Sequence, residues 1–230
     1  MSNVGFRIFT KVNRPSKELM EQFHGLPSSN ICDEMNRIGS VYEKIIPIGK
    51  TSLVGPAFTV KEQLGDIMMF HKAIALAQPG DVIVVDGQQG SLVNAMAGEL
   101  MVLWAKSKGL AGLVIDGAIR DSDAICKLDF PVYAAGVTSK GPYKQGPGEI
   151  NVPISCGGVV VTPGDIVVGD ADGIVIIPAK DAETVLAKAK NKYQNELKIR
   201  ELISKGAWAP EPTDEELKAR GCDIIDDYYK

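Results

Sequence analysis

The sequence has few of the residues that disulfide frameworks and zinc sites require. Its 230 residues include four cysteines, far apart and without a C-x-x-C pair, and two histidines without an H-E-x-x-H motif. Structural zinc sites and disulfide frameworks depend on closely spaced ligands or on many paired cysteines. The spacing argues against both, and we expect the four thiols to be free and buried, as in a reducing compartment.

Long apolar runs and an excess of positive charge are also missing. No apolar run reaches the roughly 18 residues of a membrane helix, and the first 19 residues contain no apolar core of a secretory signal. Lys and Arg number 25 against 29 Asp and Glu, which gives a net charge of −4. A basic surface for nucleic acid is therefore not indicated. We expect a cytoplasmic protein that binds neither membranes nor nucleic acid.

The composition is that of an ordinary globular protein. Hydrophobic residues make up 45% of the chain and charged residues 23%, which is enough apolar surface for a sizeable core. We find no internal repeat and no linker long enough to separate domains. The sequence therefore predicts one domain over residues 1–230, with a core at about 16–205 and a polar tail at 206–230.

The first two thirds of the chain alternate between strand and helix patterns. Early segments predict helices at 16–23, 28–38 and 66–77 and a strand at 51–60 broken by Gly55-Pro56. Short apolar runs at 81–87, 113–116 and 132–136 predict buried strands, with helices at 94–108 and 121–127 between them. Strands that alternate with helices in this way pair in parallel through crossover helices. The fold class is therefore α/β.

The last third changes its pattern. Strand-like runs at 152–154, 158–162, 165–168 and 173–177 are separated by Gly, Pro and Asp, which predicts antiparallel hairpins. A long amphipathic helix rich in Ala, Lys and Glu is predicted at 179–205. The fold should therefore combine mixed sheets with a long C-terminal helix.

Two glycine-containing loops follow predicted strands, at 86–90 and 116–121. Ligands of α/β proteins bind at such strand ends. The second loop contains Arg120-Asp121, in which a guanidinium can bind a carboxylate and an adjacent carboxylate can hold a hard cation. The alternative is an exposed pair in which Asp121 only caps the following helix. The residues alone favour that alternative.

Other candidate residues have weaker support. His71, on a predicted helix before a buried strand, is a candidate substrate-binding residue, whereas His24 has no partner motif. Lys140 follows a strand, and the sequence leaves open a Schiff base on this lysine. Residues 87–92 match neither a Walker loop nor a G-x-G-x-x-G fingerprint, so nucleotide binding is unsupported.

Several segments together resemble the RraA-like family. Glu99, twenty intervening residues and then Arg120-Asp121 match that family's acidic-x20-Arg-Asp signature. The segments PGDVIVVDG, GLAGLVIDGAIRD, DFPVYAAG and NVPISCGGVVVTPGDIVVGDADGIVIIP follow the family in order and wording. The resemblance extends over about residues 16–200.

The resemblance implies a swivelling β/β/α fold that assembles as homotrimers or dimers of trimers, with active sites between subunits. It implies a class II, metal-dependent aldolase that releases pyruvate from 4-hydroxy-4-methyl-2-oxoglutarate or 4-carboxy-4-hydroxy-2-oxoadipate and decarboxylates oxaloacetate. The family also includes non-catalytic regulators that bind ribonuclease E, which is the alternative function. A demethylmenaquinone methyltransferase label, also used in the family, is rejected because no S-adenosylmethionine loop is found.

The resemblance also implies residue roles. Asp121 would coordinate Mg²⁺, or Mn²⁺ or another divalent cation, and Arg120 would bind the pyruvyl oxygens and stabilise the enolate. Glu99 would orient a metal-bound water that takes part in proton transfer. The commoner residue at this position is Asp, whose side chain is one methylene shorter. The substitution therefore bears on how far the carboxylate reaches toward that water. The backbone N–H groups of Leu100 and Met101, at a helix start, would hold the substrate carboxylate.

Overall fold

Four strands that pair in parallel form the centre of the first of two structural units. The computed structural model describes residues 3–208 and 212–229, with the side chains of residues 89–91 outside that description. It divides into two units, Met1–Asn191 and Lys192–Lys230. The central strands of the first unit pair in the order in which they follow one another in the chain, β3 (Leu53–Glu62), β4 (Val82–Ala97), β5 (Gly112–Ile119) and β6 (Val132–Val137). The predicted parallel sheet is confirmed.

Two helices cover one face of this sheet. Helix α3 (Met68–Leu76) precedes β4, and helix α4 (Glu99–Ser107) connects β4 to β5. Their buried residues, among them Phe70 and Val102, pack against alternate strand residues such as Ile83 and Ile115. This alternation is that of parallel strands buried on both faces. The short helix α5 (Ser122–Ile125) then connects β5 to β6.

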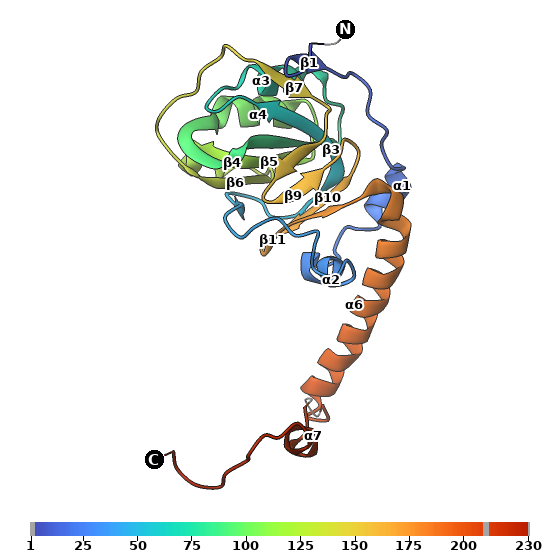
Figure 1. Ribbon diagram of the computed structural model, residues 1–230. Helices are drawn as coiled ribbons and strands as arrows, with labels where there is room; N and C mark the ends of the chain where they lie inside the picture. Colours follow the sequence, from blue (N-terminus) through green and yellow to red (C-terminus); the bar gives the residue numbers. More distant parts are fainter. Residues whose placement is uncertain (1–2, 209–211, 230) are drawn as a thin grey trace. The chain divides into compact units, whose positions relative to one another are not determined.

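The opposite face is covered by antiparallel strands. Two hairpins supply them: β8 (Ile154–Cys156) with β9 (Val159–Val161), and β10 (Ile166–Asp170) with β11 (Gly173–Ile177). Their inward side chains join those of the central strands in a second buried cluster. Figure 1 shows the order of layers, from α3 and α4 past β4 and β5 to β10 and β11. The predicted hairpins and mixed sheets are confirmed.

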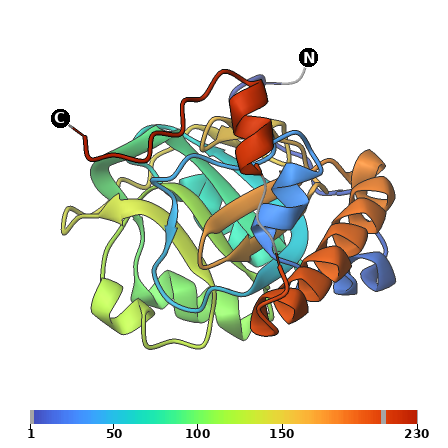
Figure 2. The same ribbon diagram turned by 90° about the horizontal axis from the view of Figure 1, so that it is seen from below.

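A third layer of helices packs on the outer side of the β10–β11 hairpin. It consists of α1 (Lys17–Glu21), α2 (Ser28–Asp33) and the beginning of α6 (Ala182–Ser204), which follows a 3-10 turn at Ala179–Asp181. The buried residues of α6 all lie in its first three turns, between Ala182 and Ala189. Lys190 Nζ donates to Gln22 Oε1 at 2.7 Å, and α1 lies beside α6 in Figure 2. Ser16 is the N-cap of α1, and its side chain accepts a hydrogen bond from the Leu19 N–H.

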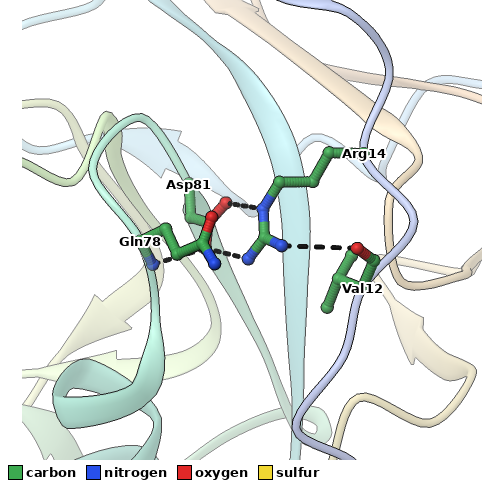
Figure 3. Close-up of polar contacts among 4 residues, drawn as sticks. All are labelled: Val12, Arg14, Gln78 and Asp81. Atoms are coloured by element: carbon green, nitrogen blue, oxygen red, sulfur yellow. Dashed lines mark hydrogen bonds and ion pairs between the residues drawn. The ribbon is translucent and has the colours of Figure 1, made fainter.

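The N-terminal segment runs along the edge of the sheet. Strand β1 (Arg7–Ile8) pairs with β7 (Gly148–Ile150), which pairs with β3, and at the other edge β2 (Ile46–Pro47) pairs with β6. Arg14 fastens the segment: its Nε and Nη2 donate to the two carboxylate oxygens of buried Asp81, each at 2.7 Å (Figure 3). A bidentate pair of this kind fixes both position and orientation.

The second unit contains the last part of α6, from Lys192, and α7 (Asp214–Ala219). Thr213 and Glu216 form a reciprocal capping box at the start of α7. The predicted polar tail therefore includes a short helix. The long C-terminal helix is confirmed. That residues 1–230 form a single domain stays a prediction.

Several element boundaries differ from those predicted, and three of the differences have a clear structural cause. Strand β3 is not broken at Gly55-Pro56, because the strand changes partner there: residues up to Pro56 pair with β10, and residues from Ala57 pair with β4. Strand β4 continues to Ala97, so α4 begins at Glu99 rather than at 94. Helix α2 ends at Asp33 rather than at Ile38, because Asn36 and Arg37 take positive φ angles.

The expectation of buried thiols is correct for one cysteine. All four thiols are free, but Cys126 and Cys222 are exposed, Cys32 is half-buried and only Cys156 is buried. The side chains at 126 and 222 lie on a helix end and in the second unit, where no core covers them. Among the described helices, none has the length and hydropathy needed to cross a membrane.

Candidate active site

The Arg120-Asp121 pair lies in the turn between β5 and α5. The backbone N–H of Arg120 donates to the carbonyl of Ala97 at 2.9 Å, which joins the end of β5 to the end of β4. Asp121 has a φ of 58° and a ψ of 34°, the left-handed conformation that Asp tolerates better than most residues. The turn therefore places both side chains next to the start of α4.

The Asp121 carboxylate does not cap its own helix. It makes no side-chain hydrogen bond to α5. Its Oδ2 instead accepts from the backbone N–H of Glu99 at 3.1 Å and lies 3.6 Å from Arg120 Nε. The capping alternative is therefore wrong. Asp121 and Arg120 are each about half exposed, so both side chains reach solvent at a helix N-terminus, where negative charge is favoured.

Gly98 permits this close approach. A Cβ at position 98 would lie 2.6 Å from Asp121 Oδ2 and 3.0 Å from Arg120 Nε. The backbone of Gly98 is extended, with a φ of −142°, so the requirement for glycine is one of space. The sequence motif thus contains a third element, a residue without a side chain in front of Glu99.

A cavity of about 490 Å³ opens at this point. Its lining includes every residue predicted for the site: His71, Glu99, Leu100, Met101, Arg120 and Asp121. Residues from α3, from the start of α4 and from the end of β5 thus meet in one hollow at the carboxyl ends of the strands. Ligands bind at this edge of open α/β sheets.

The two helix-start amides differ in availability. The N–H of Met101 already donates to the carbonyl of Gly98 at 3.1 Å. Within residues 3–208 and 212–229, no acceptor for the N–H of Leu100 is found, so this donor is free to bind an anion. The predicted roles of both amides in substrate binding stay predictions.

The cavity-lining residues that the sequence did not predict include Trp104 and Lys144. The Trp104 ring lies 5.9 Å from the His71 ring, centroid to centroid, at 44°. Burial and, second, the positive charge of Lys144 lower the pKa of His71. His71 is therefore mainly neutral at pH 7. No motif marks Lys144, which lies in an irregular loop far along the chain.

The other candidates lie elsewhere. Lys140 is not among the cavity-lining residues, and its carbonyl accepts from the Ala95 N–H at 2.8 Å. A Schiff base on Lys140 at this site has no structural support. His24 lies 3.8 Å from Glu21 on another surface.

The donor set suits a hard, largely hydrated cation. Two carboxylates line the cavity, those of Glu99 and Asp121. In the described part of the chain, no three His, Cys, Asp or Glu residues come together to form a closed metal site. Mg²⁺ binds in this manner, through one or two carboxylates with waters and substrate completing the octahedron. The residues fit such a site and do not fit a structural zinc site.

Comparison with known proteins identifies the family. Residues 28–176 match the family model described as Aldolase/RraA. The chain belongs to the RraA-like family. A Halalkalibacterium halodurans protein named "Putative 4-hydroxy-4-methyl-2-oxoglutarate aldolase" is 42% identical over 193 residues, which cover 84% of this chain and 91% of that protein. The predicted family is therefore confirmed.

Solved structures share the fold. An uncharacterised Pseudomonas syringae protein has a TM-score of 0.76 at 26% identity, covering 91% of this chain and 97% of its own. Streptomyces coelicolor RraAS2, described as an unusual member of the RNase ES inhibitor RraA protein family, has a TM-score of 0.71 at 29% identity, covering 81% and 98%. The names of these similar proteins thus include an aldolase and a ribonuclease inhibitor.

Proposed function

We propose that this RraA-like protein is a divalent-metal-dependent lyase that releases pyruvate from a 4-hydroxy-2-oxo acid and decarboxylates oxaloacetate. The main support is the position of Asp121, whose carboxylate points away from α5 and into the cavity beside Arg120. The name of the 42% identical relative supports the same reaction class.

Both reactions leave the enolate of pyruvate. Asp121 would hold the cation, with Glu99 as the second carboxylate at the same site. A divalent cation supplies a Lewis acid that polarises the 2-oxo group of the substrate. The guanidinium of Arg120 would stabilise the negative charge that develops on the 2-oxo oxygen, and the free Leu100 N–H would bind the adjacent carboxylate.

Proton transfer would fall to the Glu99 carboxylate. It lies in the first turn of α4 and lines the cavity. Glu99 would accept the proton of the 4-hydroxyl, directly or through a water, as the bond breaks. Lysine chemistry is not required.

We further propose that the site is completed by a second copy of the chain in a trimer or a dimer of trimers. Leu100, Leu103 and Trp104 on α4 are 80%, 39% and 36% exposed, beside the cavity. Apolar side chains gathered next to a binding site are typical of subunit interfaces.

The alternative is a regulator that binds a ribonuclease, as the name of the Streptomyces neighbour suggests for that protein. A regulator has no need of a metal site. The test is therefore pyruvate release from oxaloacetate and from 4-hydroxy-4-methyl-2-oxoglutarate, with Mg²⁺ and with excess EDTA, alongside calorimetry of Mn²⁺ binding. Asp121→Asn should abolish both activity and metal binding; a fully active Asp121→Asn, or no metal binding by the wild type, contradicts the proposal.

A further inference from the structure

Two walls of the cavity are connected by a buried aspartate. His71 lines the cavity from α3, and Lys144 lines it from the loop at 138–147, which connects β6 to β7. Asp66 does not line the cavity and is only 3% exposed, yet its carboxylate accepts hydrogen bonds from both of these segments. One side chain behind the cavity therefore joins two of its walls.

Each carboxylate oxygen of Asp66 accepts from a different segment. Oδ1 accepts from the Met68 N–H at 2.7 Å, at the start of α3, and Oδ2 accepts from the Gln145 N–H at 2.6 Å, in the loop. The N-cap residue of α3, Ile67, has no polar side chain, so Asp66 satisfies a helix-start N–H that the N-cap leaves free. Two donors on separate segments require two acceptor oxygens, which a carboxylate has and a carboxamide lacks.

Backbone bonds hold the loop before Lys144, and the Asp66 side chain holds it after. On the first side, the Tyr143 N–H donates to the Gly65 carbonyl at 2.8 Å. On the second side, the Gln145 N–H donates to the Asp66 carboxylate. Without that carboxylate, the chain that follows Lys144 loses this attachment to α3.

The loop and α3 interact across the cavity. A Cβ at Gly146 would lie 3.1 Å from Met68 Sδ, so the loop packs directly on the first turn of the helix. Burial and, second, the positive charge of Lys144 lower the pKa of His71, so this charge lies within electrostatic range of the helix. The position of the loop therefore sets part of the environment of the imidazole.

We infer that Asp66 is a positioning residue, whose carboxylate fixes the 138–147 loop against α3 and thereby keeps two cavity walls in the arrangement that binds substrate. The effect of Asp66 on turnover rests on the proposed lyase function, whereas its effect on the two walls does not. The reaction centre is held by other bonds, such as that from the Glu99 N–H to Asp121. Asp66 thus acts through the residues that it holds and does not touch the reacting atoms.

The imidazole of His71 reports whether the loop keeps its place. The chain has two histidines, so NMR titration of the untagged, metal-free protein follows His71 with His24, on another surface, as the internal reference. Loss of a nearby negative charge would by itself lower the pKa of a histidine. Displacement of the loop has the opposite effect, because it removes the Lys144 charge. We expect Asp66→Asn to raise the pKa of His71 toward its ordinary value of 6.5, with no change in the His24 signals.

A second substitution identifies the source of the shift. Lys144→Met should raise the pKa of His71 in the wild type and have less than about half of that effect in Asp66→Asn, because the released loop no longer holds the charge near the ring. Asp66→Ser, which keeps one oxygen for the Met68 N–H and lacks a second for the loop, should give the same result if Asp66→Asn does not fold. A His71 pKa that stays the same or falls, or fully additive effects of the two substitutions, overturns the positioning role.

Asp165→Asn is the matched control. Buried Asp165 likewise joins two N–H groups, those of Thr162 at 2.8 Å and Ala179 at 3.1 Å, and all three residues lie outside the cavity lining. Its substitution should lower the melting temperature about as much as Asp66→Asn, since each variant loses one charged hydrogen bond. The His71 titration should then match the wild type, and an equal shift in Asp165→Asn would show that general loss of stability is the cause.

Turnover distinguishes the positioning role from the function on which it rests. In Asp66→Asn, KM for 4-hydroxy-4-methyl-2-oxoglutarate should rise about 10-fold, because the substrate must order the released wall, while kcat stays within about 3-fold. Mn²⁺ should bind as in the wild type. An equal fall in kcat, or a KM no higher than that of Asp165→Asn, overturns the positioning role. If the wild type releases no pyruvate, the lyase proposal fails, and the His71 titration still decides whether Asp66 positions the loop.

Discussion

The Asp121 carboxylate accepts a hydrogen bond from the backbone N–H of Glu99 at 3.1 Å, although 22 positions separate the two residues in the chain. This contact brings the two halves of the family motif together. One half starts a helix after β4 and the other ends β5, and parallel pairing of those strands puts both at the same edge. The acidic-x20-Arg-Asp spacing is thus the length of helix α4 and strand β5 together.

Gly98→Ala tests whether the site depends on the empty space in front of Glu99. The added methyl would lie 2.6 Å from Asp121 Oδ2, so this side chain and Arg120 must move. A displacement of about 1 Å costs on the order of 100-fold in rate, and we expect that loss in kcat/KM for pyruvate release. The extended backbone accepts alanine, so the melting temperature should stay within a few degrees. Wild-type activity in Gly98→Ala contradicts the close packing of this site.

The buried carboxyl group of Glu62 should make the free energy of unfolding depend on pH. This buried side chain accepts from the Phe70 N–H through Oε1, while its Oε2 has no partner among the described residues. Burial, and to a lesser extent the nearby Asp66 charge, raises the pKa of Glu62 from 4.5 to about 8. Between these values the folded protein keeps a proton that the unfolded chain releases, so this residue makes folding less favourable as pH rises.

Glu62→Gln removes that titration and keeps an oxygen for the Phe70 N–H. Relative to the wild type, its free energy of unfolding should be nearly unchanged at pH 4.5 and higher by on the order of 1–4 kcal/mol at pH 8. Urea unfolding across this range measures the difference. A difference that does not vary with pH would show that Glu62 titrates alike in both states.

Leu103→Glu tests the proposed subunit contact. Leu103 is 39% exposed on α4 and does not line the cavity. A charge at this position should therefore weaken the association of subunits without contacting the catalytic residues. We expect the wild type, with chains of 24.6 kDa, to elute as a trimer or hexamer in light scattering and Leu103→Glu to shift toward the monomer. Ile38→Glu, at another exposed apolar residue, is the control. A monomeric wild type rules out the proposed assembly.

The sequence predicted helices and strands correctly where the local residue pattern matches the element that forms. Apolar runs ended by glycine marked β4, β5 and β6, and the hairpins were marked by their turn residues. The bounds of β4 and β3 were mistaken because they depend on partners: irregular pairing with β5 extends β4 to Ala97, and a change of partner keeps β3 continuous at Pro56. Local sequence does not record such pairing.

The sequence predicted part of the candidate site. Arg120, Asp121 and Glu99 lie in a motif with fixed spacing, and the fold brings them together as that spacing implies. Trp104 and Lys144 could not be chosen from sequence, since one resembles any apolar helix residue and the other belongs to a loop placed by Asp66 and Gly65. Their positions come from tertiary contacts alone.

The central claim is that Arg120 and Asp121 promote formation of the pyruvate enolate. Enolisation can be followed without any aldol substrate, by NMR detection of hydrogen–deuterium exchange at the methyl group of pyruvate in D₂O. The account predicts exchange in the wild type with Mg²⁺, and at least about 100-fold slower exchange with excess EDTA, in Arg120→Ala and in Asp121→Asn. Wild-type protein with bound Mg²⁺ that exchanges no faster than buffer, or an Asp121→Asn variant that exchanges at the wild-type rate, would contradict it.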